Sequence, residues 1–561
     1  MPRPFSRLPW LLLVAAIALS WSLGGHRLLD PDEGRNAEVA REMAQSGDYV
    51  VPHLDGLPYL DKPVFYFAAA AASMEALGPT EAAARLPALF FTLASVALVV
   101  WWARKRWGPE AGWLSGIALA TMPLVLAFAR ETIFDSTLAF FLTAAILALV
   151  EDRPVLAWAA IGLGGLTKGP VAILVPLLAI VPYVLLTGRS LGRVFAWRGL
   201  AVFLLIALPW FLVVTARHHE FPDYAFVRET FQRVTTKGFH RTAPFWYYIP
   251  IVLVGAFPWI VPALAQIGRP GRWRWLWEAR QVNQTAQDAL LLLCWLIVPM
   301  VFFSLNQSKL PHYVLPLLPA IALAAGYGLS RQGLALGAKA FIPVACLLGL
   351  GLITLTVWFP APISLTPAEK AAMPTVALAL GLVLVASGLT VALAIRRDTP
   401  SLGAAAYAAI VIAIPVFGGT LLRAVGEDRS SAPVADAVAA ALSQSAAAGA
   451  PAQVVGIGAF IPSLPFYLRR TIPVATATGK ELTSTYIAEY ADQFRTVPGS
   501  PLLTADAWRD LLARCPLPTI FIARAGDRDV RATLHARLPL LAEDGRFTAY
   551  GPCRGGRTGG R

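Results

Sequence analysis

Residues 155–186 read VLAWAAIGLGGLTKGPVAILVPLLAIVPYVLL, which is far too apolar for the surface of a water-soluble protein. Two apolar runs, residues 155–167 and 170–186, flank a single charged side chain, Lys168. A helix that crosses a membrane needs about 20 mainly apolar residues, within a range of roughly 17–25. Both runs are short for a span, so the turn from Lys168 to Pro170 is expected at or below the membrane surface.

The rest of the chain has the same apolar character. Hydrophobic residues make up 57% of the 561 positions and charged residues only 14%, and the mean hydropathy is +0.59. An ordinary soluble domain has about 25% charged residues. The formal net charge of +13 lies mostly in short loops between apolar runs, so membrane topology explains it better than nucleic-acid binding. The composition therefore predicts an α-helical polytopic membrane protein.

Window reading predicts about 13 transmembrane helices, at residues 8–23, 86–103, 111–129, 136–150, 155–167, 170–186, 199–215, 247–265, 289–303, 313–329, 340–358, 376–395 and 402–422. The first run lacks a small-residue cleavage site and is interpreted as an uncleaved helix rather than a signal peptide. The distribution of Lys and Arg places the N-terminus in the cytoplasm, and an odd number of spans places the C-terminal tail outside.

We predict two domains. Residues 1–422 form a transmembrane catalytic domain whose two long outer loops are residues 25–85 and 216–246. Residues 423–561 form a small extracytoplasmic α/β domain, because strand-like runs at 453–457, 471–475 and 519–523 alternate with helical stretches such as 433–448. In such a compartment Cys515 and Cys553 could form a disulfide, but the spacing alone leaves their pairing open.

Acidic residues follow the first span. The segment Asp30-Pro31-Asp32-Glu33-Gly34-Arg35 opens an amphipathic helix, so Asp32 and Glu33 are candidates for a general base or an orienting carboxylate. The structural alternative is helix capping by Asp30 or Asp32.

Further candidates lie beside prolines at the outer edges of apolar runs. Asp61 and Lys62 precede Pro63, and an ammonium at this position could hold a phosphate as a point charge. Asp135 begins the fourth span, and Lys168 ends the fifth. For the lysines the alternative is snorkelling to the membrane surface, which is common.

Two more segments repeat this pattern. His240 and Arg241 precede a run of aromatic residues, and Lys309 and Tyr313 flank a proline at the start of another span. The predicted topology brings all these charges to the outer face. A transporter would more often keep ionisable residues near the middle of the membrane. Carboxylates and cations at one surface suit a phosphate-bearing lipid whose tail stays in the bilayer.

The order and spacing of these segments resemble those of the bacterial lipid A aminoarabinose transferases, which are related to the protein O-mannosyltransferases within the GT-C class of membrane glycosyltransferases. The resemblance covers nearly the whole chain. It is carried by residues 32–35, 37–38, 41–43, 46–48, 59–63, 84–87, 167–169, 243–248 and 309–313.

The resemblance implies an enzyme of the bacterial inner membrane with its active site on the periplasmic face. The donor would be a sugar on undecaprenyl phosphate and the acceptor lipid A or another envelope molecule, with no nucleic-acid partner and no required cofactor. By this resemblance Asp32 and Asp135 are required acids, Arg35 matches the arginine after the first of them, and Tyr59, Lys62, Lys168 and Arg241 hold the donor phosphate. Their positions in the sequence add Glu33 to the predicted catalytic residues, and add Asp61, Lys309 and Tyr313 to the predicted substrate-binding residues.

The chain departs from the family pattern at a few positions. Asp61 stands where the family usually has Glu, Asn36 where it has Tyr, and Thr242 is an extra residue after Arg241. Family members can hold a divalent metal through that acid and a histidine, here Asp61 and His240, but these departures carry no metal requirement over. Another sugar, a glycan or protein acceptor, a transporter or flippase and a non-catalytic scaffold remain as alternatives.

Overall fold

The computed structural model describes residues 8–226, 228, 243–266, 271–332, 335–357, 367–397, 399–430 and 432–553. The chain divides into two compact units. Unit 1 comprises Met1–Leu23 and Arg85–Leu421, and unit 2 comprises Gly24–Ala84 and Leu422–Arg561. Residues 25–85 are predicted as an outer loop of the transmembrane domain, whereas the contacts group Gly24–Ala84 with the C-terminal tail.

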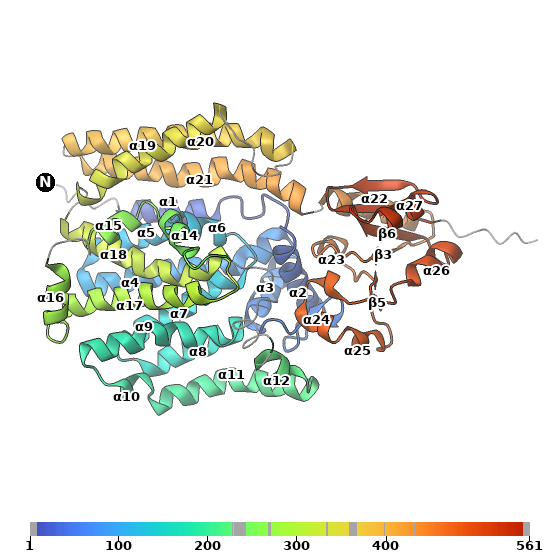
Figure 1. Cartoon of the computed structure of the whole chain (residues 1–561), viewed down its shortest axis with the longest axis horizontal. Helices are drawn as coiled ribbons and strands as arrows, with labels where there is room; N and C mark the ends of the chain where they lie inside the picture. Colours follow the sequence, from blue (N-terminus) through green and yellow to red (C-terminus); the bar gives the residue numbers. More distant parts are fainter. Residues whose placement is uncertain are drawn as a thin grey trace, which may run out of the picture. The chain divides into compact units, whose positions relative to one another are not determined.

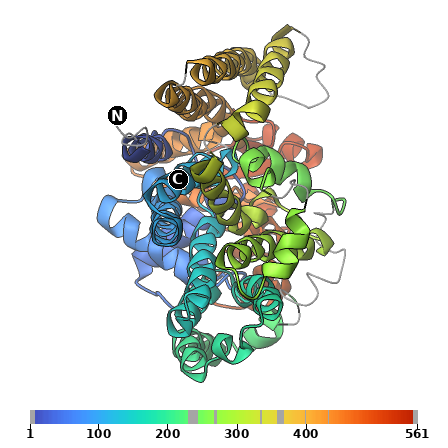
Figure 2. The ribbon, with the colours of Figure 1, turned by 90° about the vertical axis from the view of Figure 1, so that its left-hand side faces the viewer.

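Unit 1 is built from helices that run roughly side by side (Figure 1) and are seen nearly end-on in Figure 2. The elements are α1 (Leu8–Ser20), α4 (Glu81–Trp107), α5 (Pro109–Ala120), α6 (Pro123–Phe128), α7 (Phe134–Val150), α8 (Pro154–Lys168), α9 (Val171–Thr187), α10 (Leu191–Val194), α11 (Trp197–Arg217), α12 (Phe221–Asp223), α14 (Tyr248–Gly255), α15 (Ile260–Leu264), α16 (Arg272–Ala279), α17 (Gln284–Leu305), η2 (Pro311–Leu317), α18 (Leu318–Gln332), α19 (Ala335–Val357), α20 (Pro367–Arg396) and α21 (Pro400–Arg429).

Five helical segments in the described part of the chain are long and apolar enough to cross a membrane: Glu81–Trp107, Leu191–Arg217, Gln284–Leu305, Pro311–Arg331 and Glu369–Arg396. Shorter apolar helices accompany them, including Phe134–Val150 and Val171–Thr187. A multi-pass membrane protein is therefore confirmed, while the number of 13 spans stays a prediction.

Proline explains two differences from the expected spans. The run 111–129 is split between α5 and α6, because Pro123 cannot donate the hydrogen bond that a continuous helix needs there. The run 247–265 is split between α14 and α15, with Pro258 in the gap. Both breaks leave helices shorter than a bilayer is thick.

Unit 2 contains a six-stranded sheet with the order β5-β4-β3-β6-β8-β7. The neighbouring strands β5 (Leu502–Leu503), β4 (Val474–Ala475), β3 (Gln453–Ile457) and β6 (Thr519–Arg524) pair in parallel. Strand β8 (Phe547–Tyr550) pairs antiparallel with β6 on one side and with β7 (Leu540–Glu543) on the other. The strands expected at 453–457 and 519–523 are confirmed, and the expected helix is α22 (Ala432–Ala447). Cys515 and Cys553 form a disulfide.

The first-loop segment supplies the remaining elements of unit 2. These are α2 (Asp32–Ser46), the two-stranded pair β1 (His53–Leu54) and β2 (Leu57–Pro58), and α3 (Phe65–Leu77). Two carboxylates connect this segment to the tail. Asp30 accepts hydrogen bonds from the backbone N–H and the hydroxyl of Ser463, and Asp55 accepts one from the N–H of Ile472.

Candidate functional site

The candidate residues of unit 1 gather around the carboxylate of Asp135. The Lys168 ammonium lies 2.7 Å from Oδ1 and 2.8 Å from Oδ2 of Asp135. Only 4% of the Asp135 side chain and 16% of the Lys168 side chain are exposed. A carboxylate buried to this degree needs a partner, because an unpaired charge in a poorly hydrated place is costly.

Helix ends position both members of this pair. Asp135 lies in the first turn of α7, where the helix dipole favours a negative charge. Lys168 is the last residue of α8, and Gly169 follows it with a positive φ of 71° while its N–H donates to the carbonyl of Gly165. That backbone conformation is accessible to glycine at little cost, so the sequence ends α8 directly after the lysine.

His312 lies within the motif at residues 309–313 but is not among the predicted site residues. The structure places His312 Nε2 3.6 Å from Oδ2 of Asp135, on the first turn of η2. Its ring also contacts the ring of Phe128, at 5.3 Å between centroids. The signal that could have found it is its position between Lys309 and Tyr313, two residues that were selected.

Tyr313 joins this cluster, and Lys309 has a different contact. The Lys168 ammonium lies 4.5 Å from the centroid of the Tyr313 ring, within the range of a cation–π interaction. The Lys309 ammonium donates to the backbone carbonyl of Asn306, the residue that ends α17, and burial lowers the pKa of Lys309. We define the polar cluster of unit 1 as Asp135, Lys168, His312 and Tyr313.

In unit 2 the candidates lie on α2 and on the segment after β2. The Arg35 guanidinium donates to Asp32 Oδ1 at 2.6 Å and to the backbone carbonyl of Thr483 at 3.1 Å. Its Cζ atom lies 5.9 Å from the centroid of the buried Tyr59 ring. Asp32 is the more open member of the ion pair, with 44% of its side chain exposed. It remains accessible to a substrate.

Helix capping by Asp30 or Asp32, the structural alternative, is not what the structure shows. Neither Asp30 nor Asp32 caps α2, because Asp30 binds Ser463 and Asp32 binds Arg35. The buried carboxylate of Glu33 instead accepts the backbone N–H of Leu29 at 3.0 Å, one turn before it. This contact stabilises the start of the helix, so Glu33 has a structural function whether or not it takes part in catalysis.

Asp61 has contacts that fit a helix cap. Its Oδ1 accepts the N–H of Tyr486 at 2.9 Å and its Oδ2 accepts the N–H of Thr485 at 3.0 Å, at the start of α24 (Thr485–Glu489). Lys62 donates to the backbone carbonyl of Asp61. Each carboxylate oxygen of Asp61 therefore accepts one backbone N–H at the start of α24, and these contacts leave its expected part in a metal site untested.

Among the residues that the structure describes, no group of three or more His, Cys, Asp and Glu side chains could hold a metal ion. His240, Arg241 and Thr242 lie outside the described residues, so the expected metal ligand His240 and the expected phosphate ligand Arg241 stay predictions.

Comparison with known proteins extends these observations. The dolichyl-phosphate-mannose-protein mannosyltransferase family matches residues 61–212. An undecaprenyl phosphate-α-4-amino-4-deoxy-L-arabinose arabinosyl transferase of Pectobacterium atrosepticum is 34% identical over 339 residues, which cover 58% of this chain and 59% of that protein. The equivalent transferase of Serratia proteamaculans is 31% identical over 442 residues, or 75% of this chain and 72% of that protein.

The similarity extends to the three-dimensional structure. The crystal structure of ArnT from Cupriavidus metallidurans bound to undecaprenyl phosphate superposes with a TM-score of 0.77 at 26% identity, over 98% of each chain. The helical fold and this superposition define a membrane protein of the GT-C type. The Serratia match covers most of both proteins, and the chain belongs to the family of the undecaprenyl phosphate-α-4-amino-4-deoxy-L-arabinose arabinosyl transferases.

Proposed function

We propose that this protein transfers 4-amino-4-deoxy-L-arabinose from undecaprenyl phosphate to lipid A on the periplasmic face of the bacterial inner membrane. The observation that supports this most strongly is the similarity over 98% of the chain to ArnT bound to undecaprenyl phosphate. The orientation follows the sequence prediction, with the N-terminus in the cytoplasm and residues 423–561 in the periplasm. The disulfide between Cys515 and Cys553 supports that compartment for the tail, because disulfides persist where the environment is oxidising.

The polar cluster of unit 1 suits the departure of the carrier phosphate. When the bond between the sugar and the phosphate breaks, the leaving phosphate gains negative charge. The Lys168 ammonium has three N–H donors and makes two contacts with Asp135, so a donor remains for a phosphate oxygen. Fixed cations at such a position stabilise the transition state, and loss of one such contact often costs on the order of 10²–10³ in rate. Asp135 then acts as a positioning residue for the ammonium.

Asp32 is proposed as the carboxylate of unit 2 that acts on a substrate, because it remains partly exposed beside Arg35. A hydroxyl acceptor would need Asp32 as general base. A lipid A phosphate is already ionised, so Asp32 would orient the donor or the acceptor instead. Tyr59, Lys62 and Arg241 are proposed to bind the donor phosphate, on the resemblance alone.

The test uses purified protein, undecaprenyl phosphate carrying a labelled aminoarabinose, and lipid A. We expect label in lipid A with the wild-type protein and at least a hundredfold less with Asp32→Asn. Wild-type transfer of label to a protein or a different glycan instead would support the runner-up, a relative of the protein mannosyltransferases, whose family matches residues 61–212. Movement of the lipid without transfer would support a flippase.

A further inference from the structure

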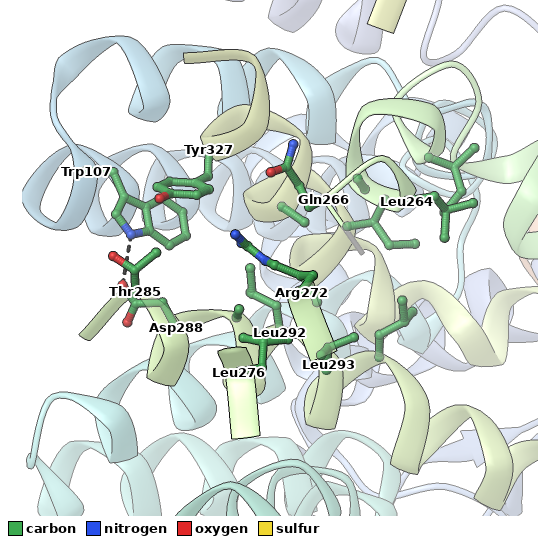
Figure 3. A pocket seen from close by; sticks show the side chains of 17 residues that line it. Trp107, Leu264, Gln266, Arg272, Leu276, Thr285, Asp288, Leu292, Leu293 and Tyr327 are labelled. Atoms are coloured by element: carbon green, nitrogen blue, oxygen red, sulfur yellow. Dashed lines mark hydrogen bonds between the residues drawn. The ribbon is translucent and has the colours of Figure 1, made fainter. Parts of the chain in front are cut away.

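A mostly apolar pocket lies in unit 1, away from the polar cluster. It is lined by side chains from α15, α16, α17 and α18 together with Trp107 at the end of α4, and it encloses about 700 Å³, counting the part that is open to the outside. Leu292 and Leu293 of α17 line it (Figure 3), and Leu296 of the same helix and Ile321 of α18 add to its apolar wall.

The pocket lies at the opposite end of α17 from the polar cluster. Asp288 lines the pocket near the start of this helix, and Asn306, which ends the helix, leads directly to Lys309 and His312. The lining extends along α17 as far as Leu296, and a rise of 1.5 Å per residue separates Leu296 from Asn306 by roughly 15 Å. The pocket is therefore separate from the proposed catalytic cluster, and the proposed topology places it at the cytoplasmic side of the membrane.

The acidic residue of the pocket is neutralised within the protein. Arg106 binds the carboxylate of Asp288, with an Nη2–Oδ1 distance of 2.7 Å, and the indole N–H of Trp107 donates to Oδ2 at 2.9 Å. Gln284 donates to the same carboxylate at 3.1 Å. Asp288 thus contributes little net negative charge to the pocket.

Arg272 gives the pocket its net positive charge. Its guanidinium points into the pocket, toward Trp107 and Tyr327, as Figure 3 shows. In the described ranges of the chain, no acidic side chain forms an ion pair with Arg272. A second cation, Arg331, lies 5.8 Å from the centroid of the Tyr327 ring, which lines the same pocket.

The helix that carries Arg272 has the character of a membrane-interface helix. Helix α16 reads RWRWLWEA, and Trp273 and Trp277, four positions apart, are both more than half exposed, whereas Leu276 is buried against the pocket. Exposed tryptophans beside arginines are typical of helices that lie in the headgroup region.

We propose that this pocket binds one acyl chain of an anionic, two-chain phospholipid from the cytoplasmic leaflet, with the lipid phosphate on Arg272. Charge complementarity determines the choice of ligand, because a zwitterionic headgroup would gain less from a pocket with one neutralised acid and an arginine that stacks on Trp275 but has no acidic partner in the described part of the chain. The apolar wall between Asp288 and Leu296 is roughly 12 Å long at 1.5 Å per residue, which is enough for part of an acyl chain.

The test is native mass spectrometry of the full-length, detergent-purified protein titrated with phosphatidylglycerol or phosphatidylcholine of the same chain length. We expect the wild type to retain phosphatidylglycerol preferentially. Arg272→Gln should lower the affinity for phosphatidylglycerol about fivefold, as expected for one basic residue at a membrane surface. The matched control is Arg274→Gln, which changes an exposed arginine of the same helix that pairs with Glu278, and it should retain wild-type binding.

A second pair of variants tests the pocket itself. Ala324→Trp fills the pocket and should abolish the preference, whereas Ile297→Trp adds the same side chain at an exposed position on α17 and should not. Equal retention of the two lipids by the wild type, or equal effects of the two members of either pair, would overturn the proposal. Displacement of the bound phosphatidylglycerol by undecaprenyl phosphate would also overturn it, because the pocket would then be a binding site for the sugar carrier. No sugar donor is present, so the outcome is independent of the proposed transfer.

Discussion

The ammonium of Lys168 and the carboxylate of Asp135 are joined by two contacts of 2.7 and 2.8 Å although 33 positions separate them in the chain. Each residue lies at the end of a helix that is short for a membrane span, and both side chains are mostly buried. The pair therefore holds a positive charge at a fixed place where an apolar environment would otherwise exclude it.

Replacing Lys168 by methionine should lower transfer at least a hundredfold, because the fixed cation is lost. It should also lower the free energy of unfolding by about 3–5 kcal/mol, since Asp135 is left as an unpaired buried charge. The double variant Asp135→Asn/Lys168→Met should regain most of the stability but not the activity. Transfer per folded protein and thermal unfolding in detergent measure both effects, and wild-type transfer by Lys168→Met would contradict the assignment.

His312→Gln should lower transfer by roughly tenfold, because the imidazole lies beside the Asp135 carboxylate and helps to orient it. Tyr313→Phe is the control: its ring can still receive the Lys168 ammonium, so the variant should retain most activity. Rates are to be compared at saturating donor. A larger loss in Tyr313→Phe than in His312→Gln would mean that the phenol, and not the imidazole, serves the cluster.

Asp61→Asn should destabilise unit 2 by about 1–2 kcal/mol, because the amide offers one oxygen where the carboxylate receives two N–H groups at the start of α24. Transfer should fall only with the folded fraction, and added Mg²⁺ or Mn²⁺ should not change the ratio of variant to wild type. Thermal unfolding and transfer with and without these metals test this. A variant that folds normally but loses metal-dependent transfer would identify Asp61 as a metal ligand.

Asp30 should make the stability of unit 2 sensitive to pH. Burial raises the pKa of this carboxyl from its ordinary value near 3.8 to about 7, against the opposing effect of its hydrogen bonds to Ser463. Between these two values the folded protein binds more protons than the unfolded chain, so this group makes stability decrease as pH rises from about 4 to 7. In Asp30→Asn that contribution should disappear.

The measurement is the thermal unfolding of the full-length wild type and Asp30→Asn at several pH values. The difference in stability between them should shift in favour of the variant as pH rises. Ser463→Ala serves as the control that removes a hydrogen bond without removing the titrating group. A difference that is constant across this pH range would show that Asp30 titrates normally.

The disulfide between Cys515 and Cys553 closes a segment of 38 positions, and its loss should cost about 4 kcal/mol if loop-closure entropy dominates. Cys515→Ser should therefore unfold unit 2 at a lower temperature than the wild type, and a reductant should reproduce that shift. Cys346→Ala, at a free cysteine, is the matched control and should respond to reductant as the wild type does. Insensitivity of the wild type to reductant would argue against the bond.

The local sequence pattern was sufficient to predict many of the helices and strands of this fold. Short, strand-like apolar runs predicted β3 and β6 within one residue of their observed ends, and the short runs around Lys168 predicted α8 and α9. These features depend on neighbours in the sequence. They could be predicted because helix and strand periodicities are local.

Contacts between distant segments could not be predicted in this way. Asp61 and Tyr486 are 425 positions apart, and nothing in the pattern around Asp61 indicates that its carboxylate would receive backbone N–H groups from the tail. The same reason explains why residues 25–85 were assigned to the transmembrane domain. The position of His312 between Lys309 and Tyr313 was the only local signal, and it does not by itself separate a packed histidine from a functional one.

The proposed transfer of aminoarabinose to lipid A can be measured directly by mass spectrometry of lipid A. Cells that lack the protein are compared with cells that express the wild type, Lys168→Met or Asp32→Asn, at equal amounts of membrane-inserted protein. We expect an additional aminopentose mass on lipid A with the wild type alone. Lipid A that is unchanged by the wild type, or modified equally by the variants, would contradict it.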